Sequence, residues 1–377
     1  MPYARIHRLS AAAPNDTAPL AECIAAGTID PAAIVAVIGK TEGNGCVNDF
    51  TRGYAVQSLQ ILFARHLPQE AVERISMVMS GGTEGGMAPH WIVVEVLAGD
   101  HAHPGPSLAV GRHITPDIDP AVLGRVGQVA LVADGVRAAM AEAGIADPAH
   151  VHFVQIKCPL LTADRVAAAR RAGRDPATSD TLKSMGLSRA ASALGVAVAL
   201  GEIEPAAISD GAIGTDRKLY SGRASASAGI ELMGHEIVVF GMAAGWSGPL
   251  AIDHAVMADG IDTEPVRAML GRLGLSAQGQ LQPPQRDRLV AMLAKAEASS
   301  TGRLRGYRHT MLDDSDISST RHARGFVVGA LAGLVGHAEI YVSGGAEHQG
   351  PDGGGPVAAI VDRAARTTSD QSTSRLS

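Results

Sequence analysis

The feature that most constrains this chain of 377 residues is a short pattern that recurs three times. Each copy has a serine, then a small residue and a glycine, with a glutamate four residues after the serine. Repetition of a whole unit at this scale indicates one supersecondary structure that is used three times. The copies are Ser80-Gly81-Gly82-Thr83-Glu84, Ser227-Ala228-Gly229-Ile230-Glu231 and Ser343-Gly344-Gly345-Ala346-Glu347.

Two cationic residues accompany each serine. A lysine closes or crosses an apolar run upstream, and an arginine opens a helix-like stretch between the lysine and the serine. Arg321 competes with Arg324 for the third arginine position, but the Arg-Gly-aromatic sequence that Arg324 shares with Arg52 favours Arg324. Three similar units around one axis would bring all these side chains to one site. The lysines are Lys40, Lys157 and Lys295, and the arginines are Arg52, Arg189 and Arg324.

The composition is that of a globular protein, with 46 % hydrophobic and 19 % charged residues. Aromatic residues make up only 3 %, so the core must consist mainly of Ala, Val, Leu, Ile and Met. A net charge of −6 argues against a nucleic-acid surface, and no apolar run approaches the ~20 residues of a membrane span. The three cysteines lack a paired spacing, which fits a reducing compartment. We therefore expect a cytoplasmic protein with neither a nucleic-acid nor a membrane partner.

Helix-like and strand-like patterns alternate along the chain, which predicts an α/β fold. We expect three structurally similar units, arranged with pseudo-threefold symmetry around a central active site and covering residues 1–103, 111–250 and 255–377. Helices are predicted over residues 120–143 and 287–293, each leading into a lysine-bearing strand. The Ser- and Thr-rich residues 367–377 should be frayed.

A lysine at the end of a buried strand is costly unless its ammonium group finds a partner or loses its proton. Burial and neighbouring positive charge both lower a lysine pKa, and a neutral lysine beside a serine hydroxyl is a workable general base. The glycines after the serines allow backbone N–H groups to face a bound oxygen. Arginine guanidinium groups suit the carbonyl rim of a flat ligand. The pattern therefore predicts a small planar ligand with near-threefold symmetry.

Two further groups of residues bear on metal binding. The Gly- and Pro-rich loop of residues 347–356 could wrap a hard cation if the Glu297 carboxylate joined it; otherwise it would be a flexible loop. His101 and His103 lie in a linker-like stretch, while His150 and His152 are predicted at surface and edge positions. Such scattered histidines do not predict a catalytic metal. No glycine-rich dinucleotide fingerprint precedes a helix, so no nicotinamide cofactor is expected.

With these motifs assembled, the chain resembles the cyclic amide hydrolase family, whose members open cyanuric acid or barbiturate rings. The resemblance covers nearly the whole chain. It implies three structural repeats around one site, a homotetramer and no catalytic metal or other cofactor. The stretches that carry it are Gly39-Lys40-Thr41-Glu42-Gly43-Asn44-Gly45, Ser80-Gly81-Gly82-Thr83-Glu84-Gly85-Gly86, Gln155-Ile156-Lys157-Cys158-Pro159-Leu160, Ser225-Ala226-Ser227-Ala228-Gly229 and residues 343–351.

The resemblance also implies residue roles. Lys157 would be the base and Ser227 the nucleophile; Ser225 lies close by, but Ser227 is the serine in register with the other two copies. A structural Mg²⁺ or Ca²⁺ would be held by Glu297 and Gln349 with main-chain oxygens around Ala346, Gly350, Pro351 and Gly354. The substrate would be bound by Lys40, Arg52, Ser80, Gly81, Arg189, Ser227, Ala228, Lys295, Arg324, Ser343 and Gly344.

The function that this implies is hydrolytic ring opening of cyanuric acid by a Ser-Lys dyad. The product would be carboxybiuret, which then gives biuret and CO₂. A barbiturase that makes ureidomalonate is the alternative within the family, and the three intact Lys–Ser pairs favour the more symmetric cyanuric acid ring. A non-catalytic threefold binder of a small ligand is the alternative outside it. Metal-dependent amide hydrolysis would need clustered His and Asp ligands, which the spacing does not predict.

Overall fold

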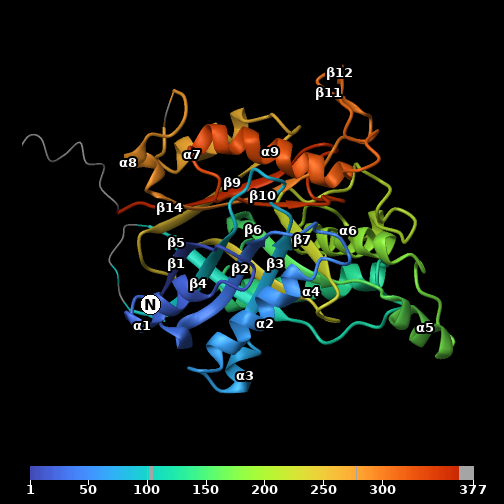
Figure 1. The fold of residues 1–377 in the computed structure, drawn as a ribbon, viewed down its shortest axis with the longest axis horizontal. Coiled ribbons are helices and arrows are strands. Elements are labelled where there is room, and N and C mark those ends of the chain that lie inside the picture. The colour runs from blue at the N-terminus through green and yellow to red at the C-terminus, as the bar shows by residue number, and fades with distance from the viewer. Residues whose placement is uncertain (100, 102–104, 277, 365–377) are drawn as a thin grey trace, which may run out of the picture.

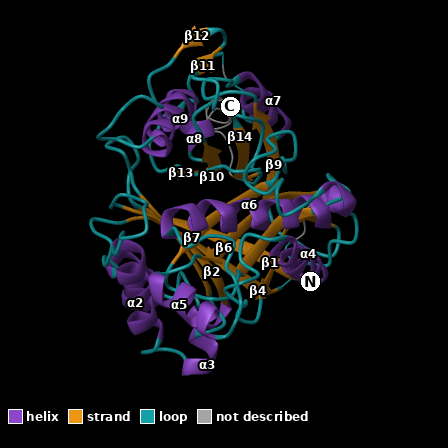
Figure 2. Ribbon diagram, turned by 90° about the vertical axis from the view of Figure 1, so that its right-hand side faces the viewer, coloured by secondary structure: helices purple, strands orange, loops and turns teal. Residues whose placement is uncertain are grey.

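Three four-stranded sheets occupy the interior of the computed structural model, and the longer helices lie around them (Figures 1 and 2). The structure describes residues 1–99, 101, 105–276 and 278–364. In the first sheet the order is β1-β4-β2-β3, in the second β5-β8-β6-β7 and in the third β9-β14-β10-β13. The three sheets thus share one topology, as a pseudo-threefold α/β architecture requires.

The strands of the first sheet are β1 (Pro2–Ser10), β2 (Ile34–Thr41), β3 (Ser76–Gly81) and β4 (His90–Ala98). The second sheet contains β5 (Ser107–Ile114), β6 (Val151–Pro159), β7 (Ala224–Gly229) and β8 (Glu236–Ala243). The third contains β9 (Leu250–Met257), β10 (Leu289–Ala296), β13 (Tyr341–Gly344) and β14 (Gly355–Asp362). A hairpin of β11 (Arg303–Leu304) and β12 (Tyr307–Arg308) stands apart from them.

The helices connect the strands of each unit. In Figure 1, α7 and α9 lie beside the third sheet, and α2 and α3 lie at the opposite end of the molecule. No helix among the described residues is long and apolar enough to cross a membrane. The helices are α1 (Ala18–Ala25), α2 (Thr51–Phe63), α3 (Gln69–Val72), α4 (Val126–Glu142), α5 (Ala163–Arg171), α6 (Thr181–Ala199), α7 (Glu264–Arg272), α8 (Pro283–Arg286) and α9 (Ser319–Val335).

One hydrophobic core is shared by the inner faces of all three sheets. It includes Ile38 of β2, Ile156 of β6 and Leu293 of β10 in one contiguous cluster. The outer face of the first sheet packs with Leu59 of α2, and the outer face of the third packs with Leu331 of α9. Because the central strands are buried on both faces, they are nearly continuous apolar runs rather than alternating ones.

The lysine strand and the serine strand of each unit are parallel neighbours. Lys40 lies opposite Ser80, Lys157 opposite Ser227, and Lys295 opposite Ser343. A parallel pair needs a long crossover connection, which accounts for the helices between each lysine and its serine. The fold therefore places the three Lys–Ser pairs at equivalent ends of three equivalent strand pairs.

Two of the predicted elements differ from the structure. The predicted helix at residues 287–293 is wrong, because β10 covers Leu289–Ala296 and pairs with β13 and β14. A short apolar run does not distinguish a helix from a fully buried strand, and sheet pairing on both sides decides here. The helix predicted from residue 120 begins only at Val126, after a turn.

The unit limits of 1–103, 111–250 and 255–377 remain predictions. The sheets themselves begin earlier, since β5 starts at Ser107 and β9 at Leu250. These first strands pair antiparallel with β8 and β14, so they belong structurally to the second and third sheets. The predicted fraying of residues 367–377 lies outside the described residues.

The close approach of α4 to β5 depends on a glycine. A Cβ atom added to Gly111 would collide with the carbonyl oxygen of Ala139 and lie 2.6 Å from the nitrogen of Ala143. Gly111→Ala should therefore lower the free energy of unfolding by about 1–3 kcal/mol, measured by denaturant unfolding. The control is Gly329→Ala on α9, where a Cβ meets nothing and stability should rise by up to about 1 kcal/mol. Unchanged stability of Gly111→Ala would contradict the packing argument.

Candidate active site

The three lysines meet at the centre of the molecule, and all are almost completely buried. Each Nζ donates a hydrogen bond to the carbonyl immediately before the serine of a different unit. Because the three bonds run in one direction around the axis, they tie the units into a closed ring. The bonds are Lys40 to Val342 (2.8 Å), Lys157 to Met79 (2.9 Å) and Lys295 to Ala226 (3.0 Å).

The contacts between lysine and serine are not equivalent in the three units. Lys40 Nζ is 3.2 Å from Ser80 Oγ, and Lys295 Nζ is 3.1 Å from Ser343 Oγ. Lys157 Nζ instead lies 2.6 Å from Glu231 Oε1. The predicted nucleophile, the Ser227 hydroxyl, shares a hydrogen bond of 3.0 Å with the Ser343 hydroxyl. In the middle unit the lysine thus forms an ion pair with a glutamate instead of a hydrogen bond with its serine.

Burial lowers the pKa of all three lysines below their ordinary value. For Lys40, burial and then Arg324 lower the pKa strongly. For Lys295, burial and then Arg189 lower it to about 7. For Lys157, burial is again the largest cause, but the Glu231 carboxylate opposes it. The environment therefore shifts all three lysines towards the neutral form that a general base requires, and Lys157 least clearly because of Glu231.

Two of the three arginines form ion pairs with the glutamate of the following unit. Arg189 holds Glu347 through two bonds of 2.8 and 2.7 Å, and Arg324 pairs with Glu84. By the same rule Arg52 should pair with Glu231, yet no such contact forms. The Arg52 guanidinium donates to the carbonyls of Ala228 (3.1 Å) and Cys46 (2.7 Å), and its buried Nε has no partner among the described residues.

A cavity on the axis is lined by one arginine and one serine from each unit. Of the predicted substrate-binding residues, only Lys40 and Lys295 are not part of its wall; they lie behind the serines. A wider cavity shares Gly45, Met185, Arg189, Thr320 and Arg324 with it and leads outward. The inner cavity is lined by Gly45, Arg52, Ser80, Gly81, Met185, Arg189, Ser227, Ala228, Thr320, Arg324, Ser343 and Gly344.

Some residues around the site have roles that the sequence did not indicate. Arg321, the alternative candidate for the third arginine position, lines the outer cavity instead and pairs with Glu84 at 2.9 Å, so it supports the glutamate that holds Arg324. Tyr341 is completely buried, which raises the pKa of its hydroxyl to about 12. That hydroxyl lies near Ser80 and Ser227 without forming a well-aligned hydrogen bond. The glutamate four residues after each serine is evident in the sequence, but the sequence does not indicate that it pairs with the arginine of another unit.

The structure brings together part of the predicted cation site. The Glu297 carboxylate is half-buried and accepts hydrogen bonds from the N–H groups of Ala346 and Ala298, both at 3.0 Å. Burial and the neighbouring Glu347 raise its pKa. Gln349 turns elsewhere, with its Oε1 accepting from Ala226 at 2.6 Å. In the same loop, the Gly350 N–H donates to the Ser221 carbonyl and the Gly354 N–H to the Pro351 carbonyl.

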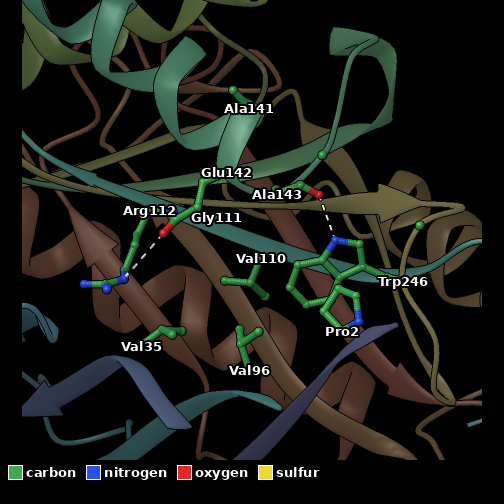
Figure 3. A pocket seen from close by; sticks show the side chains of 12 residues that line it. Pro2, Val35, Val96, Val110, Gly111, Arg112, Ala141, Glu142, Ala143 and Trp246 are labelled. Atoms are coloured by element: carbon green, nitrogen blue, oxygen red, sulfur yellow. Dashed lines mark hydrogen bonds and ion pairs between the residues drawn. The ribbon is translucent and has the colours of Figure 1, made fainter. Parts of the chain in front are cut away.

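Another cavity lies away from the axis, where β5 crosses β2 (Figure 3). Its wall is largely apolar and includes Val35, Val96, Val110 and Trp246, whose indole donates to the Ala143 carbonyl at 2.7 Å. None of the lysines, serines or arginines of the central site lines it. This cavity is therefore not a second copy of the site.

The family model of the amidohydrolase ring-opening proteins matches residues 5–362. The chain belongs to this family. A cyanuric acid amidohydrolase of Azorhizobium caulinodans is 62 % identical over 96 % of this chain and 99 % of its own length. One from a Bradyrhizobium species is 61 % identical over 96 % and 98 %.

Solved structures of two cyanuric acid hydrolases are similar to the whole chain. The enzyme of A. caulinodans superposes with a TM-score of 0.89 at 61 % identity, covering 97 % of this chain and all of that one. A second, described as an innovation by structural concatenation, gives a TM-score of 0.92 at 47 % identity, covering 96 % and 100 %. These similarities confirm the predicted family, the three-unit α/β fold and the prediction that the chain is a hydrolase.

A half-buried carboxyl group lies opposite Lys157 on the neighbouring strand. Glu236 of β8 lies opposite Lys157 in register, and its Oε2 accepts a hydrogen bond of 2.9 Å from the N–H of Met77 in the first sheet. Burial is the largest cause that raises the pKa of Glu236, from 4.5 to about 7. Ionising this group in the folded protein therefore costs stability. The cost is absent below pH 4.5, grows as the pH rises to about 7 and is complete above it.

Glu236→Gln should remove that cost. The variant should be more stable than the parent by about 1–3 kcal/mol well above pH 7 and no more stable near pH 4.5. Unfolding measured at both pH values checks this, with exposed Glu264→Gln as the control that should show no such pH dependence. Equal stability differences for Glu236→Gln at both pH values would contradict the assignment of the titration to Glu236.

Proposed function

We propose that this hydrolase opens the ring of cyanuric acid. The observation that carries the proposal is the central cavity, to which each unit contributes one arginine and one serine. Cyanuric acid has three carbonyl and three N–H groups around a flat ring, so it matches such a wall in number and symmetry. Relatives about 60 % identical over nearly their whole length bear the name cyanuric acid amidohydrolase, which supports the same substrate.

In the proposed mechanism, the Ser227 oxygen attacks one ring carbonyl while neutral Lys157 accepts the hydroxyl proton. Backbone N–H groups beside the serine stabilise the negative charge that develops on the carbonyl oxygen. The C–N bond breaks and Lys157 returns the proton to the leaving nitrogen. Water then hydrolyses the acyl-enzyme to carboxybiuret and frees Ser227. Carboxybiuret loses CO₂ to give biuret.

For this step Lys157 must leave Glu231 and turn to Ser227. The two residues are opposite each other in the parallel pair of β6 and β7, as the two hydrogen-bonded Lys–Ser pairs are in theirs. Glu231 would then be free to meet Arg52, whose Nε lacks a partner. That exchange would complete the third Arg–Glu pair and restore threefold order around the substrate.

A second path for the Ser227 proton starts from the third unit. Lys295 is 3.1 Å from Ser343 Oγ, which is 3.0 Å from Ser227 Oγ. Burial lowers the pKa of Lys295 to about 7, so a large fraction of it is neutral near neutral pH. Lys295 could thus accept the Ser227 proton through Ser343. The two paths differ in which lysine sets the pH dependence of turnover.

We also propose that a hard cation such as Mg²⁺ or Ca²⁺ binds at Glu297 with a structural role. Burial and the neighbouring Glu347 raise the pKa of Glu297, which means that a negative charge on this carboxylate is unfavourable. A bound cation would offset that cost. Oxygen donors are what such cations prefer, and carbonyls of Ala346, Gly350, Pro351 and Gly354 would complete the set. Gln349 would join them if its Oε1 left the Ala226 N–H. A homotetrameric assembly and a cytoplasmic location complete the proposal.

Purified protein should turn over cyanuric acid in preference to barbituric acid, measured by loss of ring ultraviolet absorbance. Ser227→Ala should lose activity by roughly 10⁴-fold or more, because the nucleophile is removed. The control is Ser225→Ala, since the Ser225 hydroxyl is buried without a partner and should be dispensable. A preference for barbituric acid would show that the proposed substrate is wrong. Activity in Ser227→Ala would show that Ser227 is not the nucleophile.

A pair of glutamate substitutions identifies the base. Glu231 raises the pKa of Lys157, and a base must be neutral, so Glu231→Gln should move the acid limb of the kcat/KM profile to lower pH by on the order of one unit. Glu347→Gln removes the carboxylate that raises the pKa of Lys295. If Lys157 is the base, only the first substitution moves the limb. A shift in Glu347→Gln alone would assign the base to Lys295.

A further inference from the structure

Two histidines and an aspartate meet at the crossing between the second and third sheets. His152 belongs to β6, whereas Asp253 and His254 are consecutive residues of β9. The Nδ1 atoms of His152 and His254 lie 2.9 Å apart. Asp253 Oδ1 is 3.4 Å from the His152 Nδ1 and 4.0 Å from the His254 Nδ1. All three side chains are half-buried, so the cluster is open to small ions.

These separations are those of metal ligands. With Zn–N and Zn–O bonds of about 2.0–2.2 Å, ligand atoms at tetrahedral angles lie roughly 3.3–3.6 Å apart. The three observed distances bracket this range, so an ion could bind all three atoms with small side-chain adjustments. We propose that His152, Asp253 and His254 form a transition-metal site that binds Zn²⁺, with its remaining position open to water.

The surroundings of the aspartate fit a ligand that is held in place by its neighbours. Asp253 Oδ2 accepts a hydrogen bond of 2.6 Å from Arg272 Nε, and Arg272 also donates to the His254 carbonyl at 3.1 Å. The second oxygen, Oδ1, is the one that faces the histidines and also accepts the His254 N–H. Metal-binding carboxylates are commonly oriented by such hydrogen bonds.

Comparison with the other units shows that the fold does not need a polar side chain at the position of His152. His152 lies five residues before Lys157, and the same position holds Val35 before Lys40 and Val290 before Lys295. Where β5 crosses β2, Val35 faces a largely apolar cavity that Gly111 and Arg112 also line (Figure 3). A His–Asp–His group at one crossing of three therefore calls for a cause specific to that crossing.

The position of the site limits what the metal can do. Five residues along β6 separate His152 from Lys157, which is roughly 16 Å of strand. The ion would therefore not contact the substrate. It would instead bridge β6 of the second sheet and β9 of the third, and stabilise their association because it binds only the folded chain.

The two nitrogen ligands distinguish this site from the oxygen-rich site proposed at Glu297. Imidazole nitrogen suits Zn²⁺, whereas carboxylate and carbonyl oxygens suit Mg²⁺ and Ca²⁺. The competing interpretation is a metal-free network in which one imidazole N–H donates to the other ring. Both accommodate the same distances, and metal titration separates them.

The test is a titration of untagged, chelator-treated full-length protein with Zn²⁺, with Mg²⁺ as the comparison ion. We expect stoichiometric Zn²⁺ binding by calorimetry and a higher melting temperature. Any effect of Mg²⁺, which suits the site proposed at Glu297, should be the same in the parent protein and in His152→Ala. His152→Ala should abolish the zinc effect. Arg272→Gln, which leaves the three ligands in place, should weaken zinc binding by about 10–100-fold.

Two controls keep the result specific. His150→Ala removes an exposed histidine just before β6 and should leave zinc binding unchanged. Asp253→Asn keeps the size of the side chain but removes the carboxylate, and it serves if His152→Ala fails to fold. Zinc binding that survives both His152→Ala and Asp253→Asn, or no stoichiometric binding in the parent protein, would overturn the proposal and leave a hydrogen-bonded network.

Discussion

The arrangement of the three units around the central cavity depends on hydrogen bonds that three buried lysines donate. A buried ammonium group without partners costs several kcal/mol, so each Nζ must be satisfied inside the protein. Each finds the carbonyl that precedes another unit's serine. The contacts that hold the three units together are therefore also the contacts that fix the ends of the serine strands. Association of the units and geometry of the site have one cause.

The structure departs from threefold symmetry at one place. The departure is in the ion pairs of the side chains and not in the backbone. The three sheets share one strand order and one Lys–Ser register. Only in the middle unit does the glutamate after the serine bind a lysine instead of an arginine. The consequence is an unpartnered Arg52 Nε and a Ser227 hydroxyl bonded to Ser343. The proposed ligand, which is threefold symmetric, would therefore meet a site whose ion pairs are asymmetric, and one of its carbonyls would have different neighbours from the other two.

Much of this arrangement could be predicted from the sequence because the repeats carry it. Side chains that recur with the same neighbours in three copies must occupy equivalent positions, which placed the serines and arginines around one cavity. Contacts between units leave no such trace. Nothing in the spacing indicates that Glu347 reaches Arg189, or that His152 meets His254 across two sheets. The β10 run was mistaken for a helix for the same reason, since its strand partners are distant in sequence.

Repetition also explains how one unit can acquire a distinct task. At the position opposite the lysine, the first unit has His90, whose pKa burial lowers to about 4, so that it is neutral at pH 7. The second unit has Glu236 there, with a pKa of about 7, so that it carries partial negative charge. Lys157 is thus paired with Glu231 and lies opposite Glu236, while the strand register around it is the same as around Lys40. Because strand pairing fixes which residues lie opposite each other, a change of one residue alters the charge beside one lysine without moving the other two. A chain that repeats one backbone three times can thus retain a symmetric set of cavity side chains and still place one lysine in a different charge environment from the other two.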